Sequence, residues 1–425
     1  MAELKELIAK TKKSLKNQGV LYTLKTAKNW VFLPETRMDH KLNPRLRYDN
    51  VDVLIKRIDF NKNFENGSLT KKVDPKVTKV AWIISPFHIG SGGHQTIFRF
   101  IRHLENKNYQ NHIYITDGHG FKSEKEAFET IQKHFMPLPN IKVSFLREQE
   151  LVNGHEVVED CDILFATRYN TVYYAALINN CIKRMYFVQD LENLFFPVSY
   201  LSVLVENTYK MGFIGVCASP WLSKTLQNYG MRTHSFFLGY DHKIYTDKNL
   251  VREPKSIAFY GRFESERRAV ELGMQALEAV QKVEPNMKAY IYGSNYAMKG
   301  YDVDVVNMGI LTYKQMSELF SRVQVGMSFS LTNYGLTPTE MMASGLPVVE
   351  LDGENTRSVF DQGDNIMLAE KNPTAIAETI LKLFDNGLLR EQIVKGGFDF
   401  VKDKKWSTIW DGVERFLSEE LEPYK

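Results

Sequence analysis

Cysteine is scarce in this chain, with three residues among 425. Cys161, Cys181 and Cys217 all lie in or beside apolar runs. An odd and sparse set of this kind indicates buried thiols in a reducing compartment. The sequence also has no CxxC pair and no cluster of histidine and cysteine, so we expect no structural metal.

The chain also lacks a strong excess of charge and a long apolar run. The net charge is only +3, which is too small for a general binder of polyanions, and we expect no nucleic-acid partner. No apolar stretch has the length of a membrane span, and the N-terminus has no apolar core of signal-peptide length. The composition is 44% hydrophobic and 25% charged, as in soluble globular proteins, so we expect a cytoplasmic protein.

Residues 1–76 differ from the rest of the chain and predict an N-terminal extension of helices and loops. Residues 1–33 have the pattern of one or two basic helices, with apolar residues on one face and lysines around them. Such a segment is either a solvated helix that packs on its own protein or a peripheral anchor at the inner face of the cell membrane. Residues 34–76 contain several Asn, Pro and Asp residues and few apolar periodicities.

From residue 79 onward, apolar strand-like runs alternate with amphipathic helices. Because this alternation implies a parallel sheet with helices on both faces, we expect one α/β domain over residues 77–245. A polar linker at Asp241–Glu253 separates it from a second series of the same kind over residues 246–400, and a final helix lies within 401–425. The expected strands are Val80–Ile84, His112–Ile115, Ile141–Phe145, Ile163–Ala166, Met185–Val188, Ile214–Ala218, His234–Leu238, Ile257–Tyr260, Ala289–Tyr292, Val323–Phe329, Val348–Leu351 and Ile366–Ala369.

The stretch Ser328–Val349 combines a strand, a turn at Gly335 and a short helix. Thr337 is expected at the N-cap, Pro338 at the first helical position and Glu340 at the third, which together form a capping box. Free N–H groups and the helix dipole favour an anion above such a turn. The alternative is that Glu340 only caps its own helix.

The run EMMASGLPVV, residues 340–349, resembles the nucleotide-sugar motif of retaining GT-B glycosyltransferases of the family-4 type. In that family two glutamates with seven residues between them flank a glycine turn, and the second binds the donor ribose. Glu340 matches the second glutamate, whereas Thr332 stands at the first and carries no charge. The resemblance implies two doubly wound Rossmann-like domains facing a cleft, an acceptor domain followed by a donor domain, and a C-terminal helix that crosses back to the first domain.

The segment Gly261–Arg267 follows the first strand of the second domain and resembles the GR…EK segment of the same family. The resemblance implies that Arg262 and Arg267 clamp the donor diphosphate. Fixed cations would stabilise the charge that develops on the leaving group without a metal. As isolated residues, these arginines would instead pair with Glu264 or Glu266 on the surface. The predicted donor site also contains Gly92, Gly93, Tyr334, Gly335, Leu336, Thr337 and Glu340.

The segment Tyr186–Glu192 ends a strand with two acids, and Phe195-Phe196-Pro197 follows. Acids at the carboxyl end of a strand are well placed for chemistry, although they also suit the N-terminus of a helix. The segment resembles the QDxE…FxP signature of bacterial rhamnan-type rhamnosyltransferases, which implies dTDP-L-rhamnose as the donor. The catalytic candidates are Asp190, Glu192 and Arg262, and the acceptor-side candidates are His94, Arg168, Gln189 and Asp190.

Together these patterns predict a metal-independent, retaining glycosyltransferase that needs no cofactor beyond its nucleotide-sugar substrate. The acceptor would be a growing cell-surface glycan, either an oligosaccharide or a lipid-linked chain. Two alternatives stay open: a nucleotide-sugar epimerase of the same fold, and a non-catalytic nucleotide- or glycan-binding protein. The acids and aromatics of Asp190–Pro197 favour an acceptor site over the epimerase, whereas the uncharged Thr332 keeps the non-catalytic alternative open. The loop Gly90–His94 lacks GxGxxG spacing, which argues against a dinucleotide site.

Overall fold

The computed structural model describes residues 51–70, 72–74, 76–117, 120–295 and 300–425. The chain divides into two compact units, Met1–Lys56 and Arg57–Lys425. The described part of the first unit contains one short helix, α4 (Asp52–Ile55). The helices expected within residues 1–33 lie outside the described residues.

The first sheet of the larger unit has seven strands in the order β3-β2-β1-β4-β5-β6-β7. All neighbouring strands are parallel, as expected for strands that alternate with helices. The strands are β1 (Thr78–Ile84), β2 (Tyr109–Thr116), β3 (Lys142–Leu146), β4 (Cys161–Ala166), β5 (Cys181–Val188), β6 (Ile214–Cys217) and β7 (Thr233–Ser235). The helices between them are α5 (Gly92–Glu105), α6 (Glu124–His134), α7 (Glu148–Val152), α8 (Tyr169–Leu177), η3 (Glu192–Phe195), α9 (Tyr200–Thr208) and α10 (Pro220–Gln227).

The second sheet has six parallel strands in the order β10-β9-β8-β11-β12-β13. Its strands are β8 (Ser256–Tyr260), β9 (Lys288–Tyr292), β10 (Val305–Asn307), β11 (Val325–Met327), β12 (Val348–Leu351) and β13 (Met367–Ala369). Its helices are η4 (Glu266–Arg268), α11 (Val270–Val283), α12 (Tyr313–Arg322), α13 (Thr337–Ala343), α14 (Glu354–Arg357), α15 (Pro373–Asp385) and α16 (Gly387–Val401). Strand β10 was not expected, because it is a three-residue edge strand with mostly exposed side chains.

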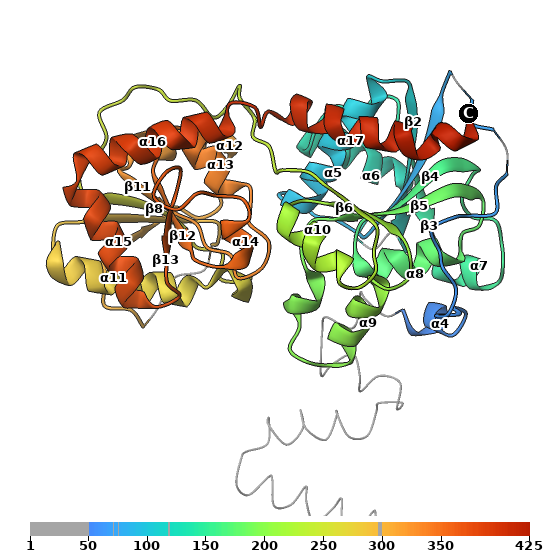
Figure 1. Cartoon of the computed structure of the whole chain (residues 1–425), viewed down its shortest axis with the longest axis horizontal. Coiled ribbons are helices and arrows are strands. Elements are labelled where there is room, and N and C mark those ends of the chain that lie inside the picture. Colours follow the sequence, from blue (N-terminus) through green and yellow to red (C-terminus); the bar gives the residue numbers. More distant parts are fainter. Residues whose placement is uncertain (1–50, 71, 75, 118–119, 296–299) are drawn as a thin grey trace, which may run out of the picture. The chain divides into compact units, whose positions relative to one another are not determined.

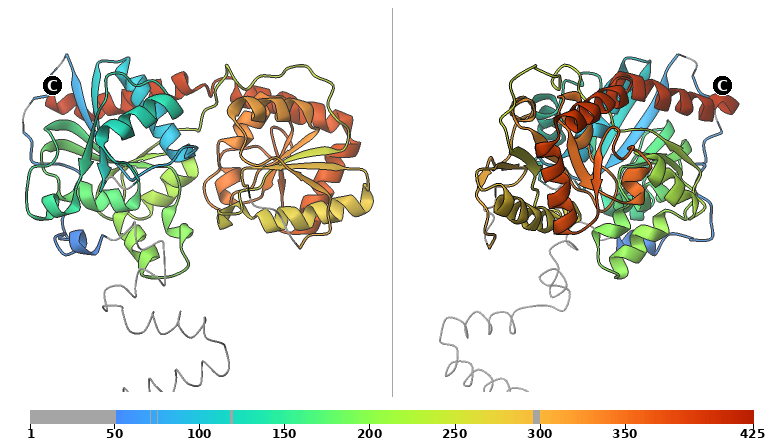
Figure 2. Two further views of the ribbon diagram at one scale, coloured as in Figure 1. Left: turned by 180° about the vertical axis from the view of Figure 1, so that it is seen from behind. Right: turned by 60° about the vertical axis from the view of Figure 1, so that its left-hand side comes forward.

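Each sheet has helices on both of its faces, so the predicted pair of doubly wound α/β domains is confirmed (Figures 1 and 2). In the core of the first domain, the ring of Trp82 on β1 stacks on the ring of Phe165 on β4, with 4.2 Å between the ring centroids. The indole N–H of Trp82 donates to Asn111 Oδ1 at 2.9 Å, so its polar atom is satisfied inside the core. The three cysteines are free and buried, as expected.

The last helix, α17 (Trp406–Leu421), packs against the first sheet and its helix α5, although it follows the second sheet in sequence (Figure 1). Trp410 is 2% exposed. Its ring lies 4.8 Å from Phe100 of α5 and 5.2 Å from Phe236. The Tyr109 hydroxyl donates to Glu414 Oε1 at 3.0 Å, which adds a polar contact to the same surface.

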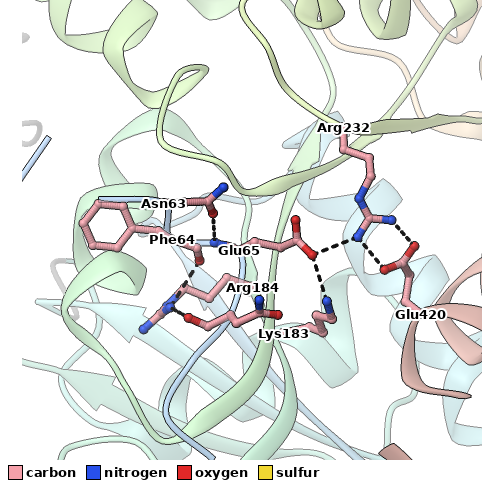
Figure 3. Close-up of polar contacts among 8 residues, drawn as sticks. Asn63, Phe64, Glu65, Lys183, Arg184, Arg232 and Glu420 are labelled. Atoms are coloured by element: carbon pink, nitrogen blue, oxygen red, sulfur yellow. Dashed lines mark hydrogen bonds and ion pairs between the residues drawn. The ribbon is translucent and has the colours of Figure 1, made fainter. Parts of the chain in front are cut away.

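The segment around Glu65 also belongs to this domain (Figure 3). Glu65 Oε1 accepts from Lys183 Nζ at 2.8 Å and from Arg232 Nη2 at 3.1 Å, and Arg232 in turn pairs with Glu420 of α17. The guanidinium of Arg184 has no exposed surface and donates to main-chain carbonyls, including that of Phe64 at 3.2 Å. Because the buried cations Lys183 and Arg184 bond to groups of this segment, the segment is part of the first domain's structure rather than a separate extension.

Candidate functional site

The order of strands reverses between β1 and β4 in the first sheet and between β8 and β11 in the second. In doubly wound sheets, ligands bind outside the carboxyl ends of the strands at such a point. The loop after β8 contains Arg262 and Arg267, and the loop after β11 leads to Gly335. The fold therefore places these two predicted segments at adjacent strand ends of the second sheet.

The turn before α13 differs from the prediction in one detail. The N-cap is Leu336 and not Thr337, and no side chain caps the helix. Leu336 already has helical backbone angles, so the helix begins at Thr337, one residue before the predicted start at Pro338. The Thr339 Oγ1 donates to the Leu336 carbonyl at 2.7 Å. The predicted capping box of Thr337 and Glu340 is therefore wrong, and the Glu340 side chain is not used for its own helix cap.

Glu340 is buried, with 6% of its surface exposed. Burial raises the pKa of its carboxyl to about 7, while Arg99 of α5 and the Tyr245 hydroxyl act in the opposite direction. Tyr245 belongs to the polar linker and is also buried, at 1% exposure. A buried carboxyl with a pKa near neutrality, set at the end of a parallel sheet, has the properties of a ligand-binding group.

The loop after β8 contains three arginines rather than the two that were predicted to act. Arg267 points to the first domain, where its Nε lies 3.2 Å from Asp190 Oδ2. Arg268 instead lies against the turn before α13: a Cβ added at Gly335 would be 3.1 Å from its Nη1. Burial lowers the pKa of Arg267, and the neighbouring Arg268 and Arg262 add to this effect. The three guanidinium groups thus concentrate positive charge beyond the carboxyl end of β8.

Asp190, which follows β5, has a partner for each of its two carboxylate oxygens. Its Oδ1 accepts from the main-chain N–H groups of Leu191 and Asn333, both at 2.9 Å. Its Oδ2 forms the ion pair with Arg267. The structure therefore brings Asp190 together with the predicted donor arginine, and its role as a catalytic group stays a prediction.

Glu192 is buried and forms hydrogen bonds with three tyrosines. Its Oε2 accepts from the Tyr169 main-chain N–H at 2.8 Å and from the Tyr186 hydroxyl at 3.2 Å, and its own N–H donates to Tyr209 at 2.9 Å. Burial raises the pKa of Glu192 to about 7, and Arg168 is the strongest influence in the other direction. The structure thus brings Arg168 and Glu192 close enough to interact.

The first glycine loop opens helix α5 at Gly92. A Cβ added at Gly93 would lie 3.4 Å from the Gln189 side chain, an ordinary contact distance, so this loop lies next to Gln189. His94 uses both ring nitrogens: Nδ1 bonds Ser91 Oγ at 2.7 Å and Nε2 bonds the Ser85 carbonyl at 3.1 Å. Burial lowers the pKa of His94 to about 4. The ring is therefore neutral at physiological pH.

Glu350, at β12, was not predicted from the sequence. It is fully buried and its Oε1 accepts from the N–H groups of Ser330 and Leu351, at 2.9 and 2.8 Å. Burial raises the pKa of Glu350 to about 8. Within the described residues its Oε2 has no hydrogen-bond partner, and the same holds for the hydroxyl of Thr332 in the adjacent loop. A single acid inside the strand Val348–Leu351 gave no pattern to detect.

The described part of the chain contains neither a cluster of metal ligands nor a membrane-spanning helix. No group of three or more His, Cys, Asp and Glu side chains is arranged to hold a metal ion there. Across the same residues, no helix is both long and apolar enough to cross a membrane.

The two facing sets of strand ends, with a C-terminal helix returning to the first sheet, define the GT-B fold of glycosyltransferases. A sucrose-phosphate synthase from Thermosynechococcus elongatus superposes on 81% of this chain and 99% of its own, with a TM-score of 0.65 at 12% identity. HepE from Anabaena, crystallised with UDP-glucose, superposes on 80% of this chain and 99% of its own, with a TM-score of 0.64 at 14% identity. At these identities the comparison shows the fold alone.

Comparison of sequences relates the second domain to a described family. Residues 255–381 match the model of the WsaF C-terminal domain. The chain is also 27% identical over 356 residues to the O-antigen biosynthesis protein RfbC of Myxococcus xanthus, a match that covers 80% of this chain. The chain spans only 27% of that relative's length.

Proposed function

We propose that this protein is a glycosyltransferase that moves a sugar from a nucleotide-diphospho-sugar to a growing cell-surface glycan. The observation that carries the proposal is the placement of Arg262, Arg267 and Arg268 after β8, and of the buried Glu340 after the neighbouring strand β11, beyond the carboxyl ends of the second sheet. The match to the WsaF C-terminal domain over residues 255–381 and the similarity to an O-antigen biosynthesis protein support it.

The proposed chemistry follows from the charge of the leaving group. Transfer releases a nucleoside diphosphate, and preorganised guanidinium groups would stabilise its developing charge. Arginine suits this task because its planar fork can bond two phosphate oxygens together. Glu340, as a carboxyl acceptor, would hold the donor ribose. The reaction would need no metal and no other cofactor, and it would retain the configuration of the sugar.

For the donor we favour dTDP-L-rhamnose. Its deoxyribose lacks a 2′-hydroxyl, so it needs fewer acceptors, which agrees with Glu340 and the uncharged Thr332. The acceptor would be an oligosaccharide or a lipid-linked glycan on the side of Gln189, Asp190 and Glu192. We further propose that the protein acts in the cytoplasm, with a peripheral membrane contact through residues 1–33.

The test is product analysis with purified protein, a rhamnose-terminated acceptor and either dTDP-L-rhamnose or UDP-glucose, each in the presence and absence of excess EDTA. A new glycoside from dTDP-rhamnose that keeps the anomeric configuration of the donor, formed equally with EDTA, is the expected result. A glycoside from UDP-glucose alone would reject the rhamnose donor and keep the transferase. A changed sugar without a glycoside would indicate an epimerase, and no product with intact nucleotide binding would indicate a non-catalytic protein.

A further inference from the structure

Asn333 belongs to the loop after β11 of the second sheet, but its side chain bonds to the first domain. Its Nδ2 donates to the carbonyls of Gln189 and Ala218, both at 3.0 Å. These carbonyls follow β5 and β6, which are neighbours in the first sheet. Asn333 is 1% exposed. Because both partners are acceptors, only the amide nitrogen can face them, and the orientation of the side chain is defined.

Two further contacts join the same loop to the first domain. The main-chain N–H of Asn333 donates to Asp190 Oδ1 at 2.9 Å. The hydroxyl of the next residue, Tyr334, accepts from the Leu238 main-chain N–H at 2.6 Å. Asn333 and Tyr334 therefore contact the first domain through side chains and main chain, immediately before the turn at Gly335.

The other side of this loop is held inside the second domain. The Ser330 N–H donates to Glu350, and Asn355 Nδ2 donates to the carbonyls of Ser330, at 3.1 Å, and of Thr332. The Leu331 N–H donates to the Arg267 carbonyl at 2.9 Å. The loop is thus bonded to each domain through a separate set of contacts.

We infer that Asn333 is a positioning residue that docks the donor turn, Tyr334–Thr337, onto the strand ends of the first domain. The inference rests on the proposed function for the identity of the ligand. Its physical basis is geometric: a buried amide with two carbonyl acceptors tolerates little displacement, and only Tyr334 separates it from Gly335. A displacement of about 1 Å in such a turn is enough to impair catalysis substantially. In this arrangement Asp190 completes the dock by accepting the Asn333 N–H.

The chain offers a matched control for the experiment. Asn355 is also buried, at 6% exposure, and its Nδ2 also donates to two carbonyls, but both of them lie in the second domain. Asn333→Asp and Asn355→Asp therefore place the same carboxylate against the same kind of acceptors. Asn333→Ala serves as a second variant that removes the donors without adding charge.

The measurement is hydrogen–deuterium exchange at the Leu238 amide together with calorimetric binding of dTDP and UDP by the full chain. We expect Asn333→Asp and Asn333→Ala to lose protection at Leu238 and to bind the nucleotide at least about tenfold more weakly, the loss expected when hydrogen bonds of about 1.4 kcal/mol are removed. Asn355→Asp should keep the protection at Leu238.

Equal loss of protection in Asn355→Asp would overturn the inference, because it would indicate general loosening of the loop. Unchanged protection and affinity in both Asn333 variants would also overturn it. If the wild-type protein binds neither nucleotide while only the Asn333 variants lose protection at Leu238, the docking role stands and the proposed function fails.

Discussion

Asp190 Oδ2 lies 3.2 Å from Arg267 Nε. Asp190 follows β5 of the first sheet, whereas Arg267 follows β8 of the second. The side chains are 14% and 29% exposed, so the pair is largely removed from water. Removing one partner of such a pair leaves an unbalanced charge, which is costly in a poorly solvated site. The pair therefore links the ends of β5 and β8 energetically as well as spatially.

A double-mutant cycle tests this link. We expect Asp190→Asn and Arg267→Gln to show a coupling free energy of about 0.5–3 kcal/mol in denaturant unfolding, the range for residues in contact. Asp190→Asn is suitable because it keeps an acceptor for the Asn333 N–H. The control cycle is the pair Lys142–Glu159, which is 52% and 64% exposed and should give less than about 1 kcal/mol. Equal coupling in both cycles would contradict the structural role.

The three arginines after β8 should differ from a surface arginine in nucleotide binding. Arg262→Ala, Arg267→Ala and Arg268→Ala should each weaken dTDP binding about tenfold or more, because a charge-assisted hydrogen bond contributes about 1.5–3 kcal/mol. Arg357, 69% exposed and paired with Asp352, is the control, and Arg357→Ala should bind normally. Isothermal titration calorimetry makes the comparison. Normal affinity in all three variants would reject the diphosphate site.

Stability should fall as the pH rises toward 8 because of buried acids. Burial raises the pKa of Glu350 to about 8 and those of Glu340 and Glu192 to about 7, whereas glutamate in an unfolded chain titrates near about 4.3. Between these values the folded protein keeps protons that the unfolded chain has lost. The free energy of unfolding therefore decreases with rising pH, by up to about 1.4 kcal/mol per pH unit for each group.

Glu350→Gln isolates one of these groups. The variant cannot titrate, so the fall in unfolding free energy between about pH 5 and 7 should become shallower by about 1.4 kcal/mol per pH unit. Glu129→Gln is the control, because the Glu129 side chain is 64% exposed. The measurement is urea unfolding across the pH range. Parallel curves for wild type and Glu350→Gln would mean that Glu350 is ionised in the folded protein.

The C-terminal helix should stabilise the first domain through Trp410. Trp410→Ala removes the buried ring that packs on Phe100 and Phe236, and it should lower the free energy of unfolding by about 3–5 kcal/mol. Leu388→Ala on α16 is the control, since Leu388 is 80% exposed and should have little effect. Equal stability of the two variants would show that α17 contributes little to the domain.

Much of the fold is accessible from the sequence because buried parallel strands require continuous apolar runs. Val80–Ile84 and Val348–Leu351 are such runs, and both are strands in the structure. Strand β10 was not predicted, since two of its three side chains are exposed and pairing with β9 rather than an apolar pattern defines it. The N-cap was placed one residue late because Leu336 has no capping side chain to identify it.

The sequence by itself determined the alternation of strands and helices and the position of charged residues after particular strands. It placed Arg262, Arg267 and Glu340 near the ends of strands, because local hydrogen bonding and apolar periodicity depend on neighbours in the chain. Only the tertiary structure decided which way each side chain points. It directs Arg267 toward Asp190 and Arg268 toward Gly335, although the two arginines are adjacent. It also joins Asn333 to Gln189, because contacts across a distance of more than one hundred residues arise from packing of the domains and leave no periodic trace in the sequence.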